Sequence, residues 1–472
     1  MDEIWRLGAV SLADRIARKE ISAREAVESI LARIEAVNET VNATPRVYPE
    51  AALAMAAAAD RRLARGEPLG LLHGVPFTVK ENIDVAGWPT TLGVPALAHD
   101  IADSDAPIVA QMKAAGAIPV ASTNLPDFGL RWHTDSSLHG ATRNPWDAGR
   151  VPGGSSGGSA AALATGMGPL SLGNDVGGSL RYPAQCCGVC SLRPSLGRVA
   201  RAAPRRSGTS GVPEMPITFQ LFLVEGPMAR EVADVRRALE VVAGPDPRDP
   251  WWVPAPLWGS ELPTPTRVAV MFDPDGLGVD PQVADGVRAA VDALAQAGYL
   301  VEEVEPPHMV EASELWRRLM FTDTRNHLLP MLREVVSTDA LRSLELNDPF
   351  IPSLDLAGYS RALADRTRLL RDWTQFMERY PLMIGPVSTA RPFAVGDDVA
   401  RTERSREIMD SQRLIVAISL LGLPAAVVPV GVCEGLPQAV QIIGRPFRED
   451  LCLDAAEAIE LAVGRITPID PH

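Results

Sequence analysis

The chain has 472 residues, of which 46% are apolar, and a formal net charge of −14 at pH 7. Its length allows a large buried core, whereas the acidic balance argues against a nucleic-acid partner, because phosphate binding needs a basic face. No apolar run approaches the roughly 20 residues that span a bilayer, and the acidic start Met1–Trp5 lacks the apolar core of a signal peptide. We therefore expect a cytoplasmic protein with no membrane partner.

Predicted helices and strands alternate along the chain. Ser22 and Glu25 form a capping box that marks the start of one helix, and the alternation of apolar and other residues in Val75–Lys80 is typical of a strand. This alternation of elements favours an α/β fold with a central sheet flanked by helices. Helices are expected in residues 11–37 (two), 50–65, 105–116, 157–166, 231–243, 281–297, most of 312–378 and 451–463, and strands in 75–80, 118–121, 169–172, 268–272, 299–304, 382–386 and 425–430.

Two stretches look irregular, residues 201–219 and 244–266, both rich in proline. Long loops of this kind are either pocket walls and lids or plain surface connections. The first carries the apolar residues Met215 and Phe219, so we predict that these side chains line a substrate pocket. The alternative is that they pack permanently into the core and that residues 311–330 determine substrate choice.

The cysteines do not indicate a metal or a disulfide scaffold. There are five, an odd number, and Cys187 and Cys190 have CxxC spacing without a second pair or a histidine cluster. We interpret them as buried thiols. No metal and no cofactor is expected.

Two glycine-rich loops hold the most informative residues. Ser155 lies in Gly153–Ser159 and Ser179 lies 24 residues later, at the end of Gly173–Ser179. The first loop matches the G-x-S-x-G nucleophile elbow, but a poor strand precedes it and the later histidines lack motif context. A flexible linker is also a weak interpretation, and the G-x-x-x-x-G-K-[ST] pattern of a phosphate-binding loop is absent.

A mechanism without histidine fits better. The chain has only three lysines, and one of them, Lys80, ends a predicted apolar strand, where burial would favour its neutral form. Lys80 is then a candidate general base, Ser155 a proton relay and Ser179 the nucleophile. Backbone amides of the second loop are expected to form the oxyanion hole, namely those of Val176, Gly177, Gly178 and Ser179.

These segments closely resemble the amidase signature family. The resemblance rests on Gly153–Ser159, on Gly173–Pro183, on Cys187–Arg198 and on the Gly-Val-Pro-x-x-x-Lys segment that ends at Lys80. It extends to further landmarks and so spans nearly the whole chain. It implies a central mixed β-sheet between helices and a Ser-cisSer-Lys triad of Ser179, Ser155 and Lys80, with Ser155 on a cis peptide bond.

The resemblance also implies one domain over residues 1–472 and supporting roles for Asp175, Arg181 and Ser156 in bracing the loops. Asn174 stands where threonine is usual, so we expect it near the substrate; Glu81 and Arg193 are further departures from the pattern. Within the domain we expect N-terminal helices in 1–66, the catalytic core in 67–200, variable loops in 201–225 and 244–266, and a variable helical segment in 311–380.

The resemblance implies a free-standing amidase that cleaves the C–N bond of linear amides and extends to carbamates (urethanes) and esters. It is expected to act on small molecules as a monomer or homodimer, with an acyl-enzyme on Ser179. The alternative is the catalytic subunit of a tRNA-dependent amidotransferase, which releases ammonia from glutamine within a complex. Residues 200–225 do not resemble the aromatic, Ser-rich stretch expected of that subunit, which favours the free hydrolase.

Overall fold

A computed structural model describes residues 3–202 and 214–472. Its main feature is an 11-stranded sheet in the order β1-β3-β2-β6-β8-β7-β12-β13-β11-β9-β10, beside a small sheet of β4 and β5. The main sheet is mixed: β2 runs parallel to β3 and β6, and β9 runs parallel to β10 and β11, while the other pairs are antiparallel. The strands are β1 (Arg46–Val47), β2 (Pro76–Lys80), β3 (Ile118–Thr123), β4 (Asp135–Ser136), β5 (Gly140–Ala141), β6 (Leu170–Asp175), β7 (Cys190–Arg193), β8 (Val224–Ala229), β9 (Arg267–Val270), β10 (Leu300–Glu303), β11 (Leu382–Pro386), β12 (Ala425–Cys433) and β13 (Leu436–Gly444).

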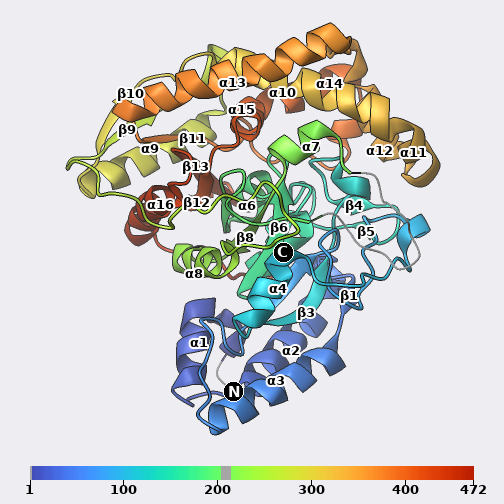
Figure 1. The fold of residues 1–472 in the computed structure, drawn as a ribbon, viewed down its shortest axis with the longest axis vertical. Coiled ribbons are helices and arrows are strands. Elements are labelled where there is room, and N and C mark those ends of the chain that lie inside the picture. Colours follow the sequence, from blue (N-terminus) through green and yellow to red (C-terminus); the bar gives the residue numbers. More distant parts are fainter. Residues whose placement is uncertain (1–2, 203–213) are drawn as a thin grey trace.

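Helices cover the sheet and extend beyond it at both ends of the molecule. In Figure 1, α1, α2 and α3 lie at the bottom, whereas α10 to α14 form a layer across the top, with α7 between that layer and the sheet. The α-helices are α1 (Ala9–Ala17), α2 (Ala23–Val41), α3 (Pro49–Ala64), α4 (Pro107–Ala114), α5 (Gly157–Ala164), α6 (Arg181–Cys187), α7 (Ile217–Phe222), α8 (Val232–Val242), α9 (Pro281–Gln296), α10 (Met309–Asp323), α11 (Leu329–Val335), α12 (Thr338–Glu345), α13 (Leu356–Arg379), α14 (Thr402–Ser411), α15 (Arg413–Leu421) and α16 (Glu449–Val463).

The predicted α/β class is confirmed, and most predicted elements lie within a few residues of their expected bounds. The capping box forms at the start of α2, where Glu25 N–H donates to Ser22 Oγ and the Ser22 amide donates to the Glu25 carboxylate. Residues 311–380 are largely helical, as expected, and residues 244–266 contain neither helix nor strand.

One expectation was wrong. Residues 201–225 are not a single loop, because they include α7 and the start of β8; the part of this segment over 203–213 lies outside the described residues. The predicted strand at 75–80 forms as β2, and all five of its residues are buried. β2 lies inside the sheet between β3 and β6, and its polar Thr78 donates to Ser171 Oγ at 2.8 Å, which removes the cost of burying the hydroxyl.

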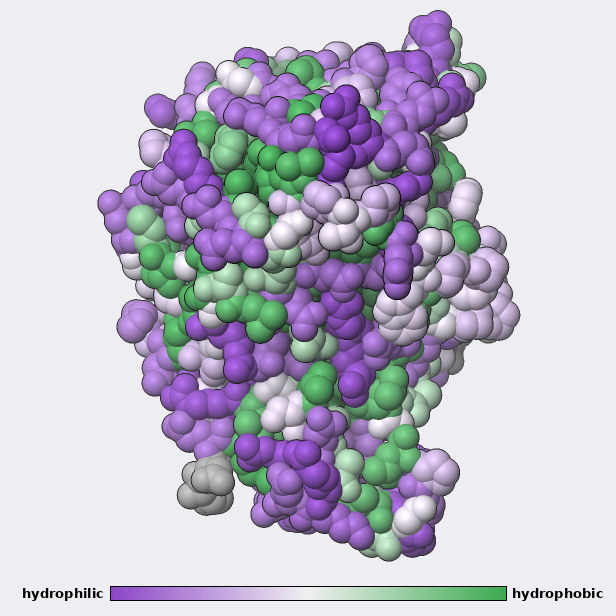
Figure 2. Space-filling model, turned by 90° about the vertical axis from the view of Figure 1, so that its left-hand side faces the viewer, coloured by the Kyte–Doolittle hydropathy of each residue, from purple (hydrophilic) through white to green (hydrophobic). Residues whose placement is uncertain are grey.

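Two large hydrophobic clusters form most of the core of the described residues, and a third, small one contains Phe321, Ile351 and Met409. The larger one joins the sheet to the helices at the bottom and sides, and the second joins α10, α13 and α15 around buried residues such as Trp373. On the face shown in Figure 2, hydrophobic residues occur in separate small groups among hydrophilic ones. Across the described residues, no helix has the length and apolar character needed to cross a membrane.

Candidate active site

The candidate site begins where two parallel strands end side by side. Lys80 is the last residue of β2, and Asn174 and Asp175 are the last two residues of the neighbouring β6. Parallel strands present their carboxyl ends at one edge of a sheet, where α/β proteins usually place their ligands. The sheet therefore brings Lys80 to the second glycine-rich loop, although Asn174 is 94 positions away from it in the chain.

Lys80 reaches the first glycine-rich loop as well. Its Nζ donates to Ser155 Oγ at 2.7 Å, and the Gly154–Ser155 peptide bond is cis. The lysine side chain is fully buried. Burial lowers the pKa of Lys80 to about 7, although the nearby Asp175 carboxylate opposes this shift. A substantial fraction of the amine is therefore unprotonated near neutral pH, which lets it accept a proton.

Asp175 anchors the second loop. It is fully buried and forms ion pairs with Arg181 (Nε to Oδ2, 3.0 Å) and Arg193 (Nη1 to Oδ1, 3.1 Å). Burial alone would raise the pKa of Asp175, but the two guanidinium groups hold it well below its usual range, so the carboxylate stays charged. It also accepts the backbone amides of Gly178 at 2.8 Å and Leu180 at 3.2 Å, which fixes the turn that carries Ser179.

Two tryptophans hold the carbonyl side of the same loop. Trp132 Nε1 donates to Gly177 O at 2.9 Å, and Trp316 Nε1 donates to Val176 O at 3.0 Å. In the described part of the chain, no group accepts a hydrogen bond from the amides of Val176, Gly177 or Ser179, whereas the Gly178 amide is occupied by Asp175. Of the four amides predicted to form an oxyanion hole, the Gly178 amide is therefore already engaged, and the other three are available to a ligand.

The loop needs glycine at its two central positions. A Cβ on Gly177 would lie 2.6 Å from the Trp316 ring, and one on Gly178, whose φ is +103°, would lie 2.3 Å from Ile415 Cγ2. Both distances are far below van der Waals contact, and the second position also has a backbone conformation that L-residues rarely adopt. The glycines therefore allow the loop to pack between a tryptophan and α15.

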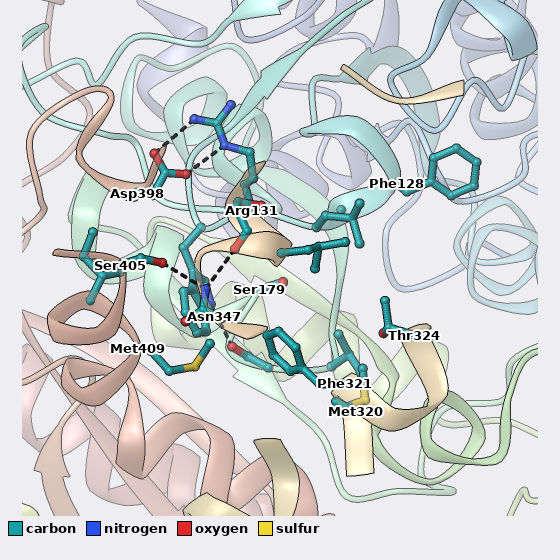
Figure 3. Close-up of a pocket in the computed structure, with 18 of the residues that line it drawn as sticks. Phe128, Arg131, Ser179, Met320, Phe321, Thr324, Asn347, Asp398, Ser405 and Met409 are labelled. Atoms are coloured by element: carbon teal, nitrogen blue, oxygen red, sulfur yellow. Dashed lines mark hydrogen bonds and ion pairs between the residues drawn. The ribbon is translucent and has the colours of Figure 1, made fainter. Parts of the chain in front are cut away.

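Ser179 opens into a cavity of about 140 Å³. Figure 3 shows Ser179 between two walls of different character: Arg131 and Asp398 face one another on one side, and Met320, Phe321 and Thr324 lie on the other. Arg131 and Asp398 form a buried bidentate pair, with distances of 2.8 and 3.0 Å. The remaining lining is largely aromatic or apolar and includes Phe128, Leu130, Trp132, Phe219, Trp316, Leu344, Ile408 and Met409.

The helices α7 and α10 together form one wall of this cavity. The amide and hydroxyl of Thr218 on α7 donate to Asp323 Oδ2 at the end of α10, and Tyr359 of α13 donates to the same oxygen at 2.9 Å. This network fixes α7 on α10, so that Phe219 and Trp316 both line the cavity. α10 then passes into a π-helical turn that starts at Thr324, another lining residue.

The two predicted pocket residues of this segment have different positions. Phe219 lines the cavity, whereas Met215 does not; it is 36% exposed and precedes α7, where its carbonyl accepts a hydrogen bond from Gln220. Asn174 does not line the cavity either, because its side chain faces Lys80. Residues 244–266 contribute nothing to the lining.

Ser156 links the two glycine-rich loops. Its amide donates to Ser179 O at 3.3 Å, and its hydroxyl lies 3.4 Å from Asn174 O. The expected bracing positions of Ser156, Asp175 and Arg181 therefore all contact the loop that carries Ser179 or the strand that leads into it. Sequence reasoning did not assign a role to Arg193, Trp132 or Trp316; the only signal was the unusual arginine at position 193.

Among the described residues, the cysteines and the acidic residues form no group that could hold a metal ion. Cys187 and Cys190 are buried, and burial raises the pKa of both thiols, so they stay protonated. Over residues 3–202 and 214–472, no three His, Cys, Asp or Glu side chains are placed to hold a metal ion together.

The chain belongs to the amidase family, whose model matches residues 25–453. Within this family it is similar to an indoleacetamide hydrolase of Bradyrhizobium diazoefficiens, with 44% identity over 98% of this chain and 87% of that protein. A glutamyl-tRNA(Gln) amidotransferase subunit of Moorella thermoacetica is more distant, with 35% identity over 97% of each chain. The structure of a bacterial aryl acylamidase of the amidase signature family superposes with a TM-score of 0.82, at 26% identity over 98% of this chain and 99% of that chain. The predicted membership of the amidase signature family is confirmed, and the protein is an amide hydrolase.

Proposed function

We propose that this protein hydrolyses primary amides whose acyl group is flat and apolar, with indoleacetamide as the first substrate to test. The observation that carries the proposal is that Ser179 lies in a cavity lined by five aromatic side chains, Phe128, Trp132, Phe219, Trp316 and Phe321. Planar rings bury a large apolar area against such walls. The similar indoleacetamide hydrolase supports the same substrate class.

In the proposed mechanism, Ser179 Oγ attacks the amide carbon while its proton passes through Ser155 Oγ to the neutral amine of Lys80. The contact that supports this route is the 2.7 Å hydrogen bond between Lys80 Nζ and Ser155 Oγ. The pKa of Lys80, lowered by burial to about 7, matches the requirement for a base that is partly unprotonated at neutral pH.

The amides of Val176, Gly177 and Ser179 are proposed to stabilise the oxyanion that forms on the carbonyl. Each such donor is typically worth about 2.7–4 kcal/mol in the transition state. The Gly178 amide is not included, because it donates to Asp175. Its role in this proposal is to hold the loop in shape.

When the tetrahedral intermediate collapses, the C–N bond breaks and the leaving nitrogen takes the proton back from Lys80 through Ser155. Water then attacks the acyl-enzyme, gives its proton to the same base, and releases the acid as the Ser179 Oγ–C bond breaks. The same steps would cleave esters, and on a carbamate they would pass through an alkoxycarbonyl-enzyme that yields carbon dioxide and an alcohol.

A substrate screen tests this proposal. Indoleacetamide, an anilide, a short aliphatic amide, an aryl carbamate and glutamine are compared at equal concentration, with ammonia or amine release as the readout. We expect the highest kcat/KM for indoleacetamide. A clear preference for the anilide would instead point to recognition of the leaving group, and Ser179→Ala serves as the blank.

The amidotransferase alternative predicts a different profile. It requires glutamine to be the preferred amide, with release of ammonia. A higher kcat/KM for glutamine than for every aromatic amide would favour this alternative. The 35% identity to the amidotransferase subunit of Moorella thermoacetica is the reason to include it in the screen.

The side chain of Phe219 should influence whether the protein prefers large or small substrates. In Phe219→Ala, the ratio of kcat/KM for indoleacetamide to that for a short aliphatic amide should fall about tenfold, because an aromatic wall of the cavity is lost. Met215→Ala is the matched control: Met215 lies four residues earlier and does not line the cavity, so the ratio should change by less than about twofold. Equal effects of the two substitutions would contradict the assignment of this wall.

A serine-directed fluorophosphonate should form its adduct on Ser179. Ser179 opens into the cavity, whereas Ser155 accepts the hydrogen bond from Lys80 behind it. Peptide mapping by mass spectrometry identifies the modified residue. An adduct on Ser155 in the wild-type protein would reverse the roles assigned to the two serines.

A further inference from the structure

Lys80 has a second partner as close as Ser155. Its Nζ donates to Asn174 Oδ1 at 2.7 Å, and Asn174 Nδ2 in turn donates to Asn82 Oδ1 at 3.0 Å. Asn82 follows β2 by two residues, and Asn174 is the penultimate residue of β6. The chain Asn82–Asn174–Lys80 thus crosses from one parallel strand end to the other. Lys80 and Asn174 are buried, with Asn174 only 7% exposed, whereas Asn82 is partly exposed.

The chemistry of the groups fixes the direction of this chain. A protonated lysine is a donor only, so the carboxamide of Asn174 must present its oxygen to Nζ. Its NH2 group is then turned toward Asn82, which must also present an oxygen. The hydrogen-bond direction is therefore determined from the lysine outward, and rotating the amide of Asn174 by 180° would set donors against donors and acceptors against acceptors.

This direction matters once Lys80 is neutral. An amine has two N–H groups and one lone pair. Because Asn174 Oδ1 can only accept, it takes one of the N–H groups, while the hydroxyl of Ser155 can both donate and accept. We propose that Asn174, held by Asn82, is a positioning residue that directs the lone pair of Lys80 toward Ser155 and so sets the path of the proton. This inference rests on the proposed role of Lys80 as the base.

Asn174 performs this task without adding charge. The carboxylate that raises the pKa of Lys80 is that of Asp175, and its charge is compensated by Arg181 and Arg193. Glu81 pairs instead with Arg46 and His139. Of the other elements packed against β2, β3 and α5 contain no ionisable residue, and the buried positions of α2 are all apolar. Asn82, which accepts the hydrogen bond from Asn174, is also a neutral group.

Two substitutions of Asn174 should move the pH profile in opposite directions. Asn174→Asp places a carboxylate against Nζ, which favours the ammonium form, so the midpoint of the profile should rise by about one pH unit or more. Asn174→Leu removes the acceptor from the charged form, so the midpoint should fall, and the rate on the alkaline plateau should drop roughly tenfold because the lone pair is no longer fixed.

The rate constant for inactivation by a fluorophosphonate, measured from pH 5 to 10, reports on these changes without depending on the natural substrate. Asn82→Asp is the matched control, since its carboxylate would lie one side chain further from Nζ; the midpoint should rise by less than in Asn174→Asp. Asn82→Leu, which frees the Asn174 amide to rotate, should lower the plateau rate and leave the midpoint in place. Thermal unfolding of each variant establishes that it is folded.

If both Asn174 variants react more slowly but keep the wild-type midpoint, Asn174 has only a structural role and the inference is wrong. Should Asn174→Leu fail to fold, the comparison of Asn174→Asp with Asn82→Asp still tests the inference. Equal shifts of the midpoint in these two variants would contradict the positioning role of Asn174. Failure of the proposed function gives a different result. If Lys80→Met still reacted with the fluorophosphonate at the wild-type rate, Lys80 would not be the base. If the protein did not hydrolyse indoleacetamide, the shifts of the pH profile would still be observed.

Discussion

Replacing Lys80 should reduce kcat/KM for amide hydrolysis on the order of 10⁴-fold, whether the new residue is methionine or arginine. Methionine has no basic group. Arginine stays protonated throughout the pH range in which proteins are folded, so it cannot accept a proton from Ser155. The substitutions are measured by steady-state kinetics at pH 8, with Lys113→Met as control, because Lys113 pairs with Asp105 at 2.7 Å in a partly exposed position away from the site.

The pH dependence of the wild-type protein follows from the same residue. Because the unprotonated amine is the active form and burial lowers its pKa to about 7, kcat/KM should rise through pH 7 and level off above about pH 8. A flat profile between pH 6 and 9, with chemistry rate-limiting, would contradict a lysine base. So would substantial activity of Lys80→Arg.

Loss of activity in Lys80→Met should come with a gain in stability. The pKa of Lys80 is about 7 in the folded protein and about 10.4 in an unfolded chain, so between these values the unfolded state binds more protons. The penalty of burying the amine is therefore complete below pH 7 and fades toward pH 10. Methionine removes the penalty at the cost of the hydrogen bonds to Ser155 and Asn174. We expect the unfolding free energy to rise by roughly 1–3 kcal/mol at pH 6.5 and by less at pH 9. A variant that unfolds at the wild-type urea concentration at both pH values would show that Lys80 carries no such penalty.

Local patterns were sufficient for most elements of the fold. The capping box at Ser22 and the apolar periodicity of α9 and α16 lie within single segments, so their physical cause is visible in the sequence. The helix α7 could not be found in this way. It has only six residues, and a contact 105 positions away, between Thr218 and Asp323, holds it in place.

The candidate site divides in the same manner. The glycine-rich loops and Lys80 were recognisable because their chemistry depends on residues at fixed short spacings. The cavity walls were not, since Trp132, Trp316 and Asp398 come from segments that only the tertiary structure brings together. Asn174 was predicted near the substrate from its neighbour in sequence, but the pairing of β6 with β2 turns its side chain to Lys80 instead.

The substitution Asp175→Asn should have the largest effect on stability. The carboxylate is fully buried and compensates both Arg181 and Arg193, so its neutralisation leaves two guanidinium groups without a counter-charge inside the protein. Breaking a buried ion pair from one side costs about 3–5 kcal/mol, a large part of the roughly 5–15 kcal/mol by which proteins are typically stable. Urea unfolding at pH 7 measures the loss, and activity should fall with it because the turn at Gly178 and Leu180 loses its charged acceptor.

The origin of this loss can be separated from a general sensitivity to charge. Asp470→Asn is the matched control, since Asp470 pairs with Arg33 at 2.7 Å but is 70% exposed, and it should cost less than about 1 kcal/mol. Adding Arg193→Met to Asp175→Asn should recover part of the stability by removing one uncompensated charge.

Because the pKa of Asp175 is depressed in the folded protein, its contribution to stability is complete above the unfolded pKa of about 3.9 and is lost as the pH falls toward the folded pKa. The difference between wild type and Asp175→Asn should therefore be constant from pH 5 to 8 and shrink below pH 4; equal urea midpoints of the two proteins at pH 7 would show that Asp175 does not hold this loop.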